Sequence, residues 1–485
     1  MMTITPTLLR AVALFWPLLL GLLLWIWRQP QPRLVIGILL AALWNGVTLL
    51  GLHLLAQHFG WWRFAAEGGL FLGIPLDLYF GWVALWSIVP ALIFAPLSYN
   101  RGDTDGSTGP QSMGQSFPPL AFYRRQLVQQ SLNLALLLLL MLGIDLVTMP
   151  HLAPVLELGQ YWGMGEGLGI LGCLLPAQLL AFWTARNDHL LVRSGMLILL
   201  FGAIFLLCLP TIIFAWTADS WYTLWQRPLW VTSIWVQLFM IPSIVGVSAV
   251  GEFAQRGKGT PLPFDPPTRL VSSGIYAYIA NPMQLAMVLL LFGLSLLLQS
   301  RWLALAAAVA LIYSIGLAYW SERGDLETRF GRDWGRYRQA VANWWPRWRP
   351  WHPSLLGRDA LPADQLYLAM SCEPCSELAI WFAKQEPVGL ELHPAETFPG
   401  VLPTRITYRH GADGTVESGV AAFARGLEHL HLGWALVGMT LRLPLLCQFA
   451  QLLADAVGAT PRQLQRNILQ TEHCASAAKL PKPNE

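Results

Sequence analysis

The chain has 485 residues, of which 55% are hydrophobic and only 12% are charged. Soluble globular domains carry about 25% charged residues, so this composition argues against a soluble protein. The net charge of +3 is too small to indicate a nucleic-acid partner. The 24 tryptophans and the long apolar runs indicate instead a surface that faces lipid.

Apolar stretches of the length that crosses a bilayer recur through the first two thirds of the chain. The first stretch is too long for a secretory signal and lacks a small-residue cleavage site. Lipid leaves no backbone group unpaired, and these runs are continuous rather than alternating, so they predict helices rather than a barrel. The sequence therefore predicts an all-α polytopic membrane protein with about nine transmembrane helices, at residues 8–27, 33–55, 74–97, 129–149, 162–184, 190–214, 229–251, 283–299 and 302–320.

The distribution of Lys and Arg between these spans predicts the orientation. Basic residues gather in every second connecting segment, namely 28–33, 98–128, 185–193 and 252–282, and are sparse in the segments between them. Basic loops stay in the cytoplasm. We therefore expect a multi-pass protein of the cell (inner) membrane, with its N-terminus outside and everything after Trp320 in the cytoplasm.

Two polar clusters flank the last two predicted spans, one over residues 272–284 and one from Glu322 to about Pro346. A tight hairpin between the spans would return the second cluster to the membrane face of the first, so both would line one pocket. Pro282 suits the first turn of a helix, and Asn281 is placed to cap it. The alternative is that these Tyr, Trp and Arg residues only anchor the helices at the interface.

The motifs in these clusters resemble a known family. They are Gly-Ile-Tyr-x-Tyr-x-x-Asn-Pro-Met from Gly274, then Glu322, Leu-x-x-x-Phe-Gly-x-x-x-x-x-Tyr from Leu326, and Trp-Pro at Trp345. This order is similar to that of the isoprenylcysteine carboxyl methyltransferase and phospholipid methyltransferase superfamily, over about residues 229–350. The chain departs from the family at Ala280, where Arg is usual. The resemblance implies a membrane enzyme that uses S-adenosylmethionine to methylate a lipid or isoprenoid acceptor.

The resemblance also implies roles for individual residues. Glu322 would be the catalytic residue of the transferase, and no metal would be required, because positioning in a dry cavity does most of the work. Four further residues would form or brace the cytoplasmic cover: Arg329, Phe330, Gly331 and Tyr337. The cofactor would contact Tyr276, Tyr278, Asn281, Pro282, Met283 and Glu322. The alternative is a non-catalytic membrane scaffold.

The front half holds polar residues within or beside apolar runs: His53, Asp77, Asp145 and Glu166. Acids at membrane depth are costly and often functional, although Asp77 and Glu166 could instead lie at the interface. The elements His…Gly-x-Pro-x-x-x-x-x-Gly-Trp and Asp…Trp-x-x-Gly-Glu loosely resemble membrane carotenoid-modifying enzymes. That resemblance implies an isoprenoid-modifying enzyme in residues 1–215, as an alternative to a region of unknown role.

The tail holds a Cys-x-x-Cys motif, Cys372 to Cys375. Residues 366–370 predict a short strand, and an amphipathic helix follows the motif through about Lys384. This order is that of a thioredoxin-type site, in which a helix N-terminus favours the thiolate, so Cys372 would be the nucleophile and Cys375 the resolving thiol. Structural cysteines remain an alternative, as does a metal site, although zinc needs four ligands and only two thiols are close in sequence.

The rest of the tail predicts a strand at Arg405–Tyr408, a turn at His410–Gly414 and helices from Val420. The segment from Ser418 to Leu427, followed by Leu-Arg-Leu-Pro at 441–444, resembles the thioredoxin-like DCC thiol-disulfide family. The resemblance implies a cytoplasmic α/β thioredoxin-like domain that acts on a thiol-disulfide partner protein, with a redox sensor as the alternative.

The sequence thus predicts four regions. They are an N-terminal transmembrane region at 1–215, a methyltransferase-like membrane domain at 216–355, a thioredoxin-like domain at 361–470 and a disordered tail at 471–485. The expected partners are the bilayer, a lipid or isoprenoid substrate and a thiol-disulfide protein.

Overall fold

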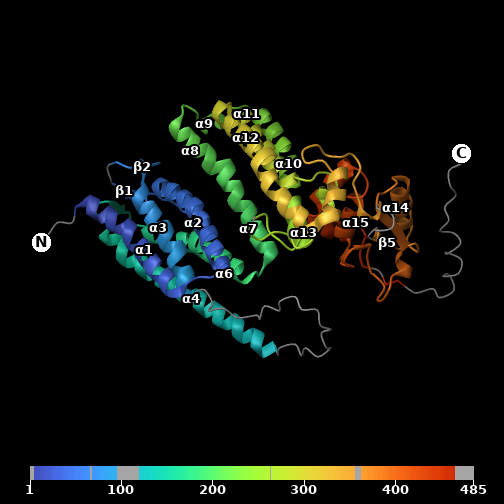
Figure 1. The fold of residues 1–485 in the computed structure, drawn as a ribbon, viewed down its shortest axis with the longest axis horizontal. Coiled ribbons are helices and arrows are strands. Elements are labelled where there is room, and N and C mark those ends of the chain that lie inside the picture. The colour runs from blue at the N-terminus through green and yellow to red at the C-terminus, as the bar shows by residue number, and fades with distance from the viewer. Residues whose placement is uncertain are drawn as a thin grey trace. The chain divides into compact units, whose positions relative to one another are not determined.

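The structure is a computed structural model, and it describes residues 5–65, 68–94, 120–262, 264–355, 362–461 and 463–464. The expected tail at 471–485 lies outside these residues. The chain divides into two compact units, Met1–Ala218 and Asp219–Glu485 (Figure 1). Each unit is described by itself below.

The first unit is a set of helices with two small antiparallel ribbons. In one ribbon β1 (Trp62–Phe64) pairs with β4 (Leu156–Leu158), and in the other β2 (Leu70–Phe71) pairs with β3 (Ile74–Pro75). The sequence predicted an all-α membrane region without these strands, because two or three residues are too few to show the alternation of polar and apolar side chains that marks a strand. The helices are α1 (Pro6–Arg28), α2 (Pro32–Phe59), α3 (Leu76–Phe94), α4 (Leu120–His151), α5 (Trp162–Gly169), α6 (Leu175–Arg186), α7 (Leu190–Ala203) and α8 (Leu209–Trp216).

Short π-helical segments join two pairs of these helices into longer spans. The segment η1 (Ile170–Leu174) joins α5 to α6, and η2 (Ile204–Cys208) joins α7 to α8. A proline follows each segment by two residues, Pro176 and Pro210. Because proline has no N–H, the helix loses one regular hydrogen bond there, and a π turn accommodates the loss.

A proline inside α3 is compensated by a side chain from α6. Pro90 has no N–H to donate to the carbonyl of Trp86, one turn earlier. The buried Gln178 donates its Nε2 to that carbonyl instead, at 2.7 Å. Membrane helices tolerate proline where a neighbouring helix satisfies the freed group in this way. The contact fixes Trp86 inside the bundle.

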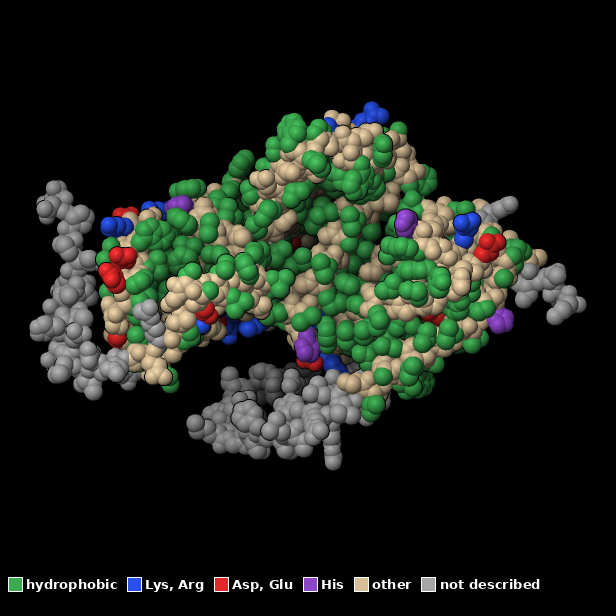
Figure 2. All heavy atoms as spheres, turned by 180° about the vertical axis from the view of Figure 1, so that it is seen from behind, with side chains coloured by type: hydrophobic (Ala, Val, Ile, Leu, Met, Phe, Trp, Pro, Cys, Tyr) green, Lys and Arg blue, Asp and Glu red, His purple; other side chains and the backbone are tan. Residues whose placement is uncertain are grey.

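The transmembrane prediction is largely confirmed. Among the described residues, eight helices are long and apolar enough to cross a membrane, and the predicted span 283–299 corresponds to a shorter apolar helix, α11 (Pro282–Leu298), of 17 residues. Hydrophobic side chains cover much of the surface, and charged side chains are sparse over it (Figure 2). The chain is a multi-pass membrane protein. The eight spans are Pro6–Arg28, Pro32–Phe59, Leu76–Phe94, Ser131–His151, Trp162–Arg186, Leu190–Trp216, Leu229–Gln255 and Arg301–Ala340.

The second unit begins with the membrane helices that carry the methyltransferase-like motifs. The helix α11 packs against both α10 (Leu229–Gln255) and α12 (Arg301–Tyr313). A short helix α9 (Tyr222–Trp225) precedes them, and a 3₁₀ turn η3 (Gly274–Ala277) lies between α10 and α11. A π segment η4 (Ser314–Ala318) joins α12 to α13 (Tyr319–Ala340), so the helix continues well beyond the predicted end of the last span.

The C-terminal part of this unit holds a four-stranded sheet with strand order β6-β5-β7-β8. The strand β5 (Asp364–Leu368) runs parallel to β6 (Leu390–Pro394), and the helix α14 (Glu373–Lys384) connects them. The strands β7 (Thr407–Arg409) and β8 (Val416–Ser418) complete the sheet in antiparallel pairing. The predicted strands near 366 and 405 and the end of the helix at Lys384 are confirmed, whereas β6 and β8 were not predicted. Three helices follow: α15 (Val420–Leu427), α16 (Leu432–Leu441) and α17 (Pro444–Ala456).

Candidate functional site

The hairpin of α11 and α12 brings the two polar clusters together, as the sequence predicted. Gln284, in the first turn of α11, donates its Nε2 to Oε1 of Glu322 at the start of α13, at 3.1 Å. The two residues are 38 positions apart in sequence. Glu322 and the segment before α11 therefore lie at the same end of the helix pair.

The two tyrosines of the first cluster are buried. The ring of Tyr276 lies against Phe253 of α10, with 6.3 Å between ring centroids. The hydroxyl of Tyr278 donates to the backbone carbonyl of Glu428 at 2.8 Å. Burial raises the pKa of both phenols well above the usual value for tyrosine, so each is a neutral donor. Tyr278 thus contacts the C-terminal domain through its hydroxyl, whereas the ring of Tyr276 packs against α10.

The last turn of α13 and the chain that follows it brace this cluster from the other side. The hydroxyl of Tyr337 donates to the carbonyl of Tyr276 at 2.8 Å. Backbone hydrogen bonds at 2.8–3.0 Å add three further ties between 277–280 and 342–351: Ala280 N to Ala342 O, Arg347 N to Tyr278 O and Trp351 N to Ala277 O. Tyr337 therefore contacts the loop before α11 directly.

The other residues predicted for the cover lie around a break in α13. Gly331 has φ +49°, a conformation that favours glycine, and it bends the helix. Phe330 packs against the apolar group formed around Tyr337, whereas Arg329 reaches back to Asp325 at 3.4 Å. The structure thus places Phe330 beside Tyr337 and leaves Arg329 in an ion pair on its own helix.

The start of α11 follows the prediction in part. Pro282 occupies the first turn, as expected, and Met283 packs against the apolar group around Tyr276. The expectation that Asn281 caps the helix through its side chain is wrong, because that side chain makes no capping hydrogen bond. Asn281 has φ −119° and ψ 59°, outside the extended conformation typical of a capping residue.

Glu252 is a residue of this region that the sequence did not single out. It lies in the last turn of α10 with only 1% exposure, and its carboxylate lies 2.5 Å from Arg425 and 2.8 Å from Arg442. The hydroxyl of Ser273 donates to it at 2.9 Å. A Cβ on Gly274, where φ is +58°, would lie 2.8 Å from Glu252 Cγ. The loop at the start of the candidate site therefore packs closely around this carboxylate.

Further charges extend the Glu252 contacts into a network with the C-terminal domain. Arg425 also contacts Glu428 at 3.1 Å and Glu417 at 2.9 Å, and Arg442 contacts Glu428 at 2.7 Å. Burial alone would lower the pKa of Arg425, but the surrounding carboxylates raise it well above the usual value. Arg425 is therefore charged although it is buried. These five residues are called the ionic network: Glu252, Glu417, Arg425, Glu428 and Arg442.

Apolar contacts reinforce the ionic network. Ala435 and Met439 of α16 are buried in the same apolar group as Ala249, Ile275 and Tyr276. The loop that carries the predicted cofactor residues therefore packs between α10 and the C-terminal domain.

A second buried polar cluster surrounds Asp364, at the start of β5. Tyr408 donates its hydroxyl to Oδ2 at 2.5 Å, and the backbone N–H of Gly411 donates to Oδ1 at 2.6 Å. Three imidazoles lie 3.4–3.6 Å from the carboxylate: His352, His410 and His429. Burial alone would raise the pKa of Asp364, but the histidines hold it well below its usual value. Among the described residues no group of His, Cys, Asp and Glu is arranged to hold a metal ion.

The two cysteines of the tail lie at the start of α14. Cys372 is the N-cap residue, and its carbonyl accepts hydrogen bonds from Cys375 N at 3.0 Å and Ser376 N at 2.9 Å. Cys372 is buried and Cys375 is partly exposed. Glu396 accepts hydrogen bonds from the N–H and the hydroxyl of Ser371, at 3.2 and 3.0 Å, which anchor the loop before the motif.

The acids of the front half fall into two groups. Asp77, in the first turn of α3, forms an ion pair with Arg10 of α1 at 2.7 Å, which satisfies its charge near the helix ends. Asp145 and Glu166 are each 1% exposed, inside the helices of the first unit. His53 of α2 is buried as well.

Comparison with known proteins gives one match. The model of the phospholipid methyltransferase family matches residues 231–332, from α10 into α13. This match supports a membrane methyltransferase that acts on lipid. No curated protein and no solved structure matches the chain significantly.

Proposed function

We propose that α10 to α13, with the loop before α11, form an S-adenosylmethionine-dependent methyltransferase whose acceptor is a membrane lipid or isoprenoid. The hydrogen bond between Gln284 and Glu322 carries the proposal, because it closes the hairpin within the matched segment. It sets Glu322 beside the residues that the family resemblance assigns to the cofactor.

The residues present fit the polar groups of the cofactor. Oε1 of Gln284 is buried and has no hydrogen-bond partner among the described residues, so it can accept a hydrogen bond from a ligand. The cofactor offers an ammonium group and ribose hydroxyls, which are donors. Glu322 would accept from the same groups. Ala280 supplies no cation for the cofactor's carboxylate, so the binding is expected to rest on donors meeting Gln284 and Glu322.

The residues of this site would act by position. When bound, the cofactor supplies a methyl group on a sulfonium, and its transfer needs alignment and a dry cavity rather than a covalent nucleophile. Tyr276 is held by Tyr337 at its carbonyl and by Phe253 at its ring, so it is a fixed wall. Glu322 would orient the donor side of the cofactor or the amine of the acceptor.

The test is binding and turnover with purified full-length protein in lipid nanodiscs. Calorimetry measures S-adenosylmethionine binding, and lipid extraction after incubation with methyl-labelled cofactor measures transfer. Glu322→Gln is expected to lower transfer at least tenfold. Glu327→Gln is the matched control, because Glu327 lies on the same helix and its ion pair with Arg323 is exposed. Absence of cofactor binding to the wild type would refute the enzyme and leave the scaffold.

We infer a thiol-redox role for the C-terminal domain, with a thioredoxin-like fold. Three observations support it: Cys372 begins α14 directly after β5, β6 returns parallel to β5, and β7 and β8 pair antiparallel at the other side of β5. Cys372 occupies the N-cap position of α14, where a Cys-x-x-Cys site of this type carries its attacking thiol. A protein with a thiol or disulfide would be the partner.

Differential alkylation of the full-length protein at neutral pH tests the redox role. Cys372 is expected to react at least tenfold faster than Cys447, a partly buried cysteine of α17 that serves as the control. Equal rates for Cys372, Cys375 and Cys447 would show that the cysteines are structural. Cysteine-accessibility labelling in oriented vesicles tests the cytoplasmic position that we propose for this domain in the cell membrane.

A further inference from the structure

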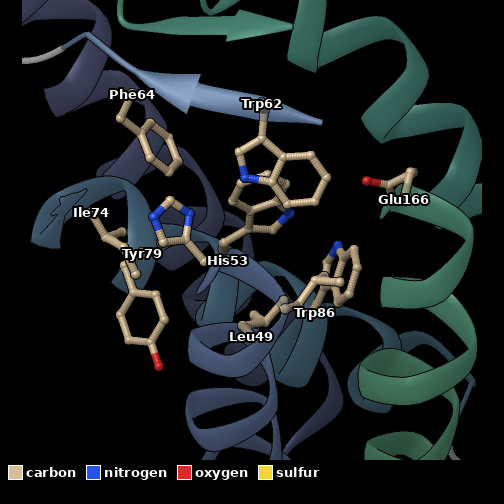
Figure 3. A pocket seen from close by; sticks show the side chains of 10 residues that line it. Leu49, His53, Trp62, Phe64, Ile74, Tyr79, Trp86 and Glu166 are labelled. Carbon is tan, nitrogen blue, oxygen red and sulfur yellow. The ribbon is translucent and has the colours of Figure 1, made fainter. Parts of the chain in front are cut away.

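A small pocket in the first unit is lined by both aromatic and ionisable side chains (Figure 3). His53 of α2 and Glu166 of α5 point into it, with the indole of Trp62 between them. The rest of the lining is apolar or aromatic: Leu49, Leu52, Phe64, Ile74, Tyr79, Trp82 and Trp86.

Several polar atoms at this pocket have no hydrogen-bond partner among the described residues. They are both ring nitrogens of His53, Nε1 of Trp62 and Oε1 of Glu166. The three side chains are buried, with exposures of 4%, 4% and 1%. An unpaired polar group inside a membrane bundle costs several kcal/mol, so a site with this many is built to receive a polar group from elsewhere.

One carboxyl oxygen of Glu166 faces the pocket without a partner among the described residues, while the carboxyl group also contacts a second acid. Its carboxyl group lies beside that of Asp145 on α4 and interacts with it. Asp145 also accepts a hydrogen bond from Nε1 of Trp86 at 2.9 Å. Two adjacent buried carboxyl groups cannot both be ionised, so the pair shares a proton and carries at most one negative charge. Oε1 of Glu166 remains available to a ligand.

The unpaired atoms select the chemistry of the ligand. Trp62 can only donate, so it requires an acceptor, which an ammonium group does not provide. The acid pair repels an anion such as a phosphate or carboxylate. A hydroxyl group satisfies both conditions, because it accepts from Trp62 and donates to Glu166 or His53. The cavity volume of about 20 Å³ is room for one group the size of water.

The apolar surroundings of the pocket favour a ligand in which this hydroxyl is attached to a hydrocarbon. A second cavity of about 50 Å³ lies on the other side of Phe64 and Trp82, which line both. Its other walls are mostly apolar and include Trp16, Leu78 and Leu85. Asp145 lines this second cavity and Glu166 lines the first, so the acid pair lies between them.

We propose that this pocket binds the hydroxyl end of a lipidic alcohol, whose hydrocarbon body lies along Phe64 and Trp82 toward the second cavity. The hydroxyl accepts a hydrogen bond from Trp62 and donates one to Glu166 or His53. The proposal is independent of the methyltransferase site, which uses none of these residues.

Competition binding on the full-length protein in nanodiscs tests the proposal. The probe is tritiated geranylgeraniol, and the competitors are unlabelled geranylgeraniol, its methyl ether, the hydrocarbon that lacks the oxygen, and hexadecanol. The ether can accept from Trp62 but cannot donate, so it should compete at least tenfold more weakly than the alcohol, and the hydrocarbon more weakly still. Competition by hexadecanol distinguishes a general lipidic alcohol from an isoprenoid one, and either supports the proposal.

Variants test whether the alcohol binds in this pocket. Glu166→Leu and His53→Phe should each weaken binding at least tenfold, whereas Glu157→Gln should leave it unchanged, because Glu157 is exposed on β4 of the same unit. If Glu166→Leu fails to fold, Trp62→Phe replaces it, since it removes only the donor. No binding to the wild type, or equal competition by alcohol and ether, would overturn the proposal and assign the polar atoms to ordered water only.

Discussion

Glu252→Gln is the substitution that most directly tests how the C-terminal domain is held on the membrane helices. The change keeps the shape of the side chain and removes its charge. Glu252 is 1% exposed and contacts Arg425 at 2.5 Å and Arg442 at 2.8 Å, so the variant leaves two buried guanidinium groups without one of their counter-charges.

The expected cost follows from the contacts that remain. Removing one partner of a buried ion pair costs about 3–5 kcal/mol, because the other charge stays buried. Arg425 keeps Glu417 and Glu428, and Arg442 keeps Glu428, so we expect the lower end, about 3 kcal/mol. The local opening equilibrium of the C-terminal domain would then rise by about two orders of magnitude.

Hydrogen exchange of α15 and α16 in the full-length protein, purified in detergent, measures that opening. The melting temperature in the same detergent gives a second measure of the loss of stability. Glu386→Gln is the control, because Glu386 faces Arg349 at 3.6 Å with a side chain that is 82% exposed. Exposed pairs contribute less than about 1 kcal/mol. A loss in Glu252→Gln no larger than in the control would refute the reasoning. Adding Arg425→Met should restore part of the loss, since both charges are then absent.

Three further predictions concern single side chains. Tyr278→Phe removes the hydrogen bond to the carbonyl of Glu428 and should cost about 1–3 kcal/mol in the same exchange experiment, because that carbonyl loses a buried donor. Burial lowers the pKa of His410, so the stability of the folded state should fall as the pH drops below about 6.5. His410→Asn should reduce this pH dependence, as measured by melting temperatures from about pH 7.5 to about pH 5. The pKa of Asp364 is held low, so Asp364 changes the stability only below its ordinary pKa of 3.8. Gly331→Ala places a Cβ at φ +49° and should cost about 1 kcal/mol and reduce cofactor binding, measured by calorimetry, because α13 straightens there.

The membrane helices could be predicted from the sequence because the signal is local. A run such as 190–214 contains enough apolar residues by itself to define a span, and the structure has one continuous helix there from Leu190 to Trp216. The fold-back at the candidate site was also predictable. Two adjacent spans with a short connection return the chain to the same end, and the contact between Gln284 and Glu322 follows from that.

The ionic network could not be predicted, because its members are distant in sequence and ordinary in composition. Glu252 looks like an interfacial acid at the end of a span, and Arg425 looks like a residue of a surface helix. Only tertiary packing makes them partners. The side chain of Asn281 illustrates the opposite error: the residue type and position favour a cap, but the conformation required by the tight loop before α11 prevents it.

The position of Glu252 has a consequence for how the two parts of the second unit can act. Glu252 contacts Ser273 at the start of the candidate cofactor loop and Arg425 and Arg442 of the C-terminal domain, and Tyr278 of that loop is bonded to Glu428. Separating the C-terminal domain from the membrane helices would therefore break the ion pairs of Glu252 with Arg425 and Arg442 and remove the hydrogen bond of Tyr278 to Glu428. Since breaking buried ion pairs is costly, the C-terminal domain supports the fold of the candidate methyltransferase site, and its sheet reaches the ionic network through Glu417 of β8, which contacts Arg425.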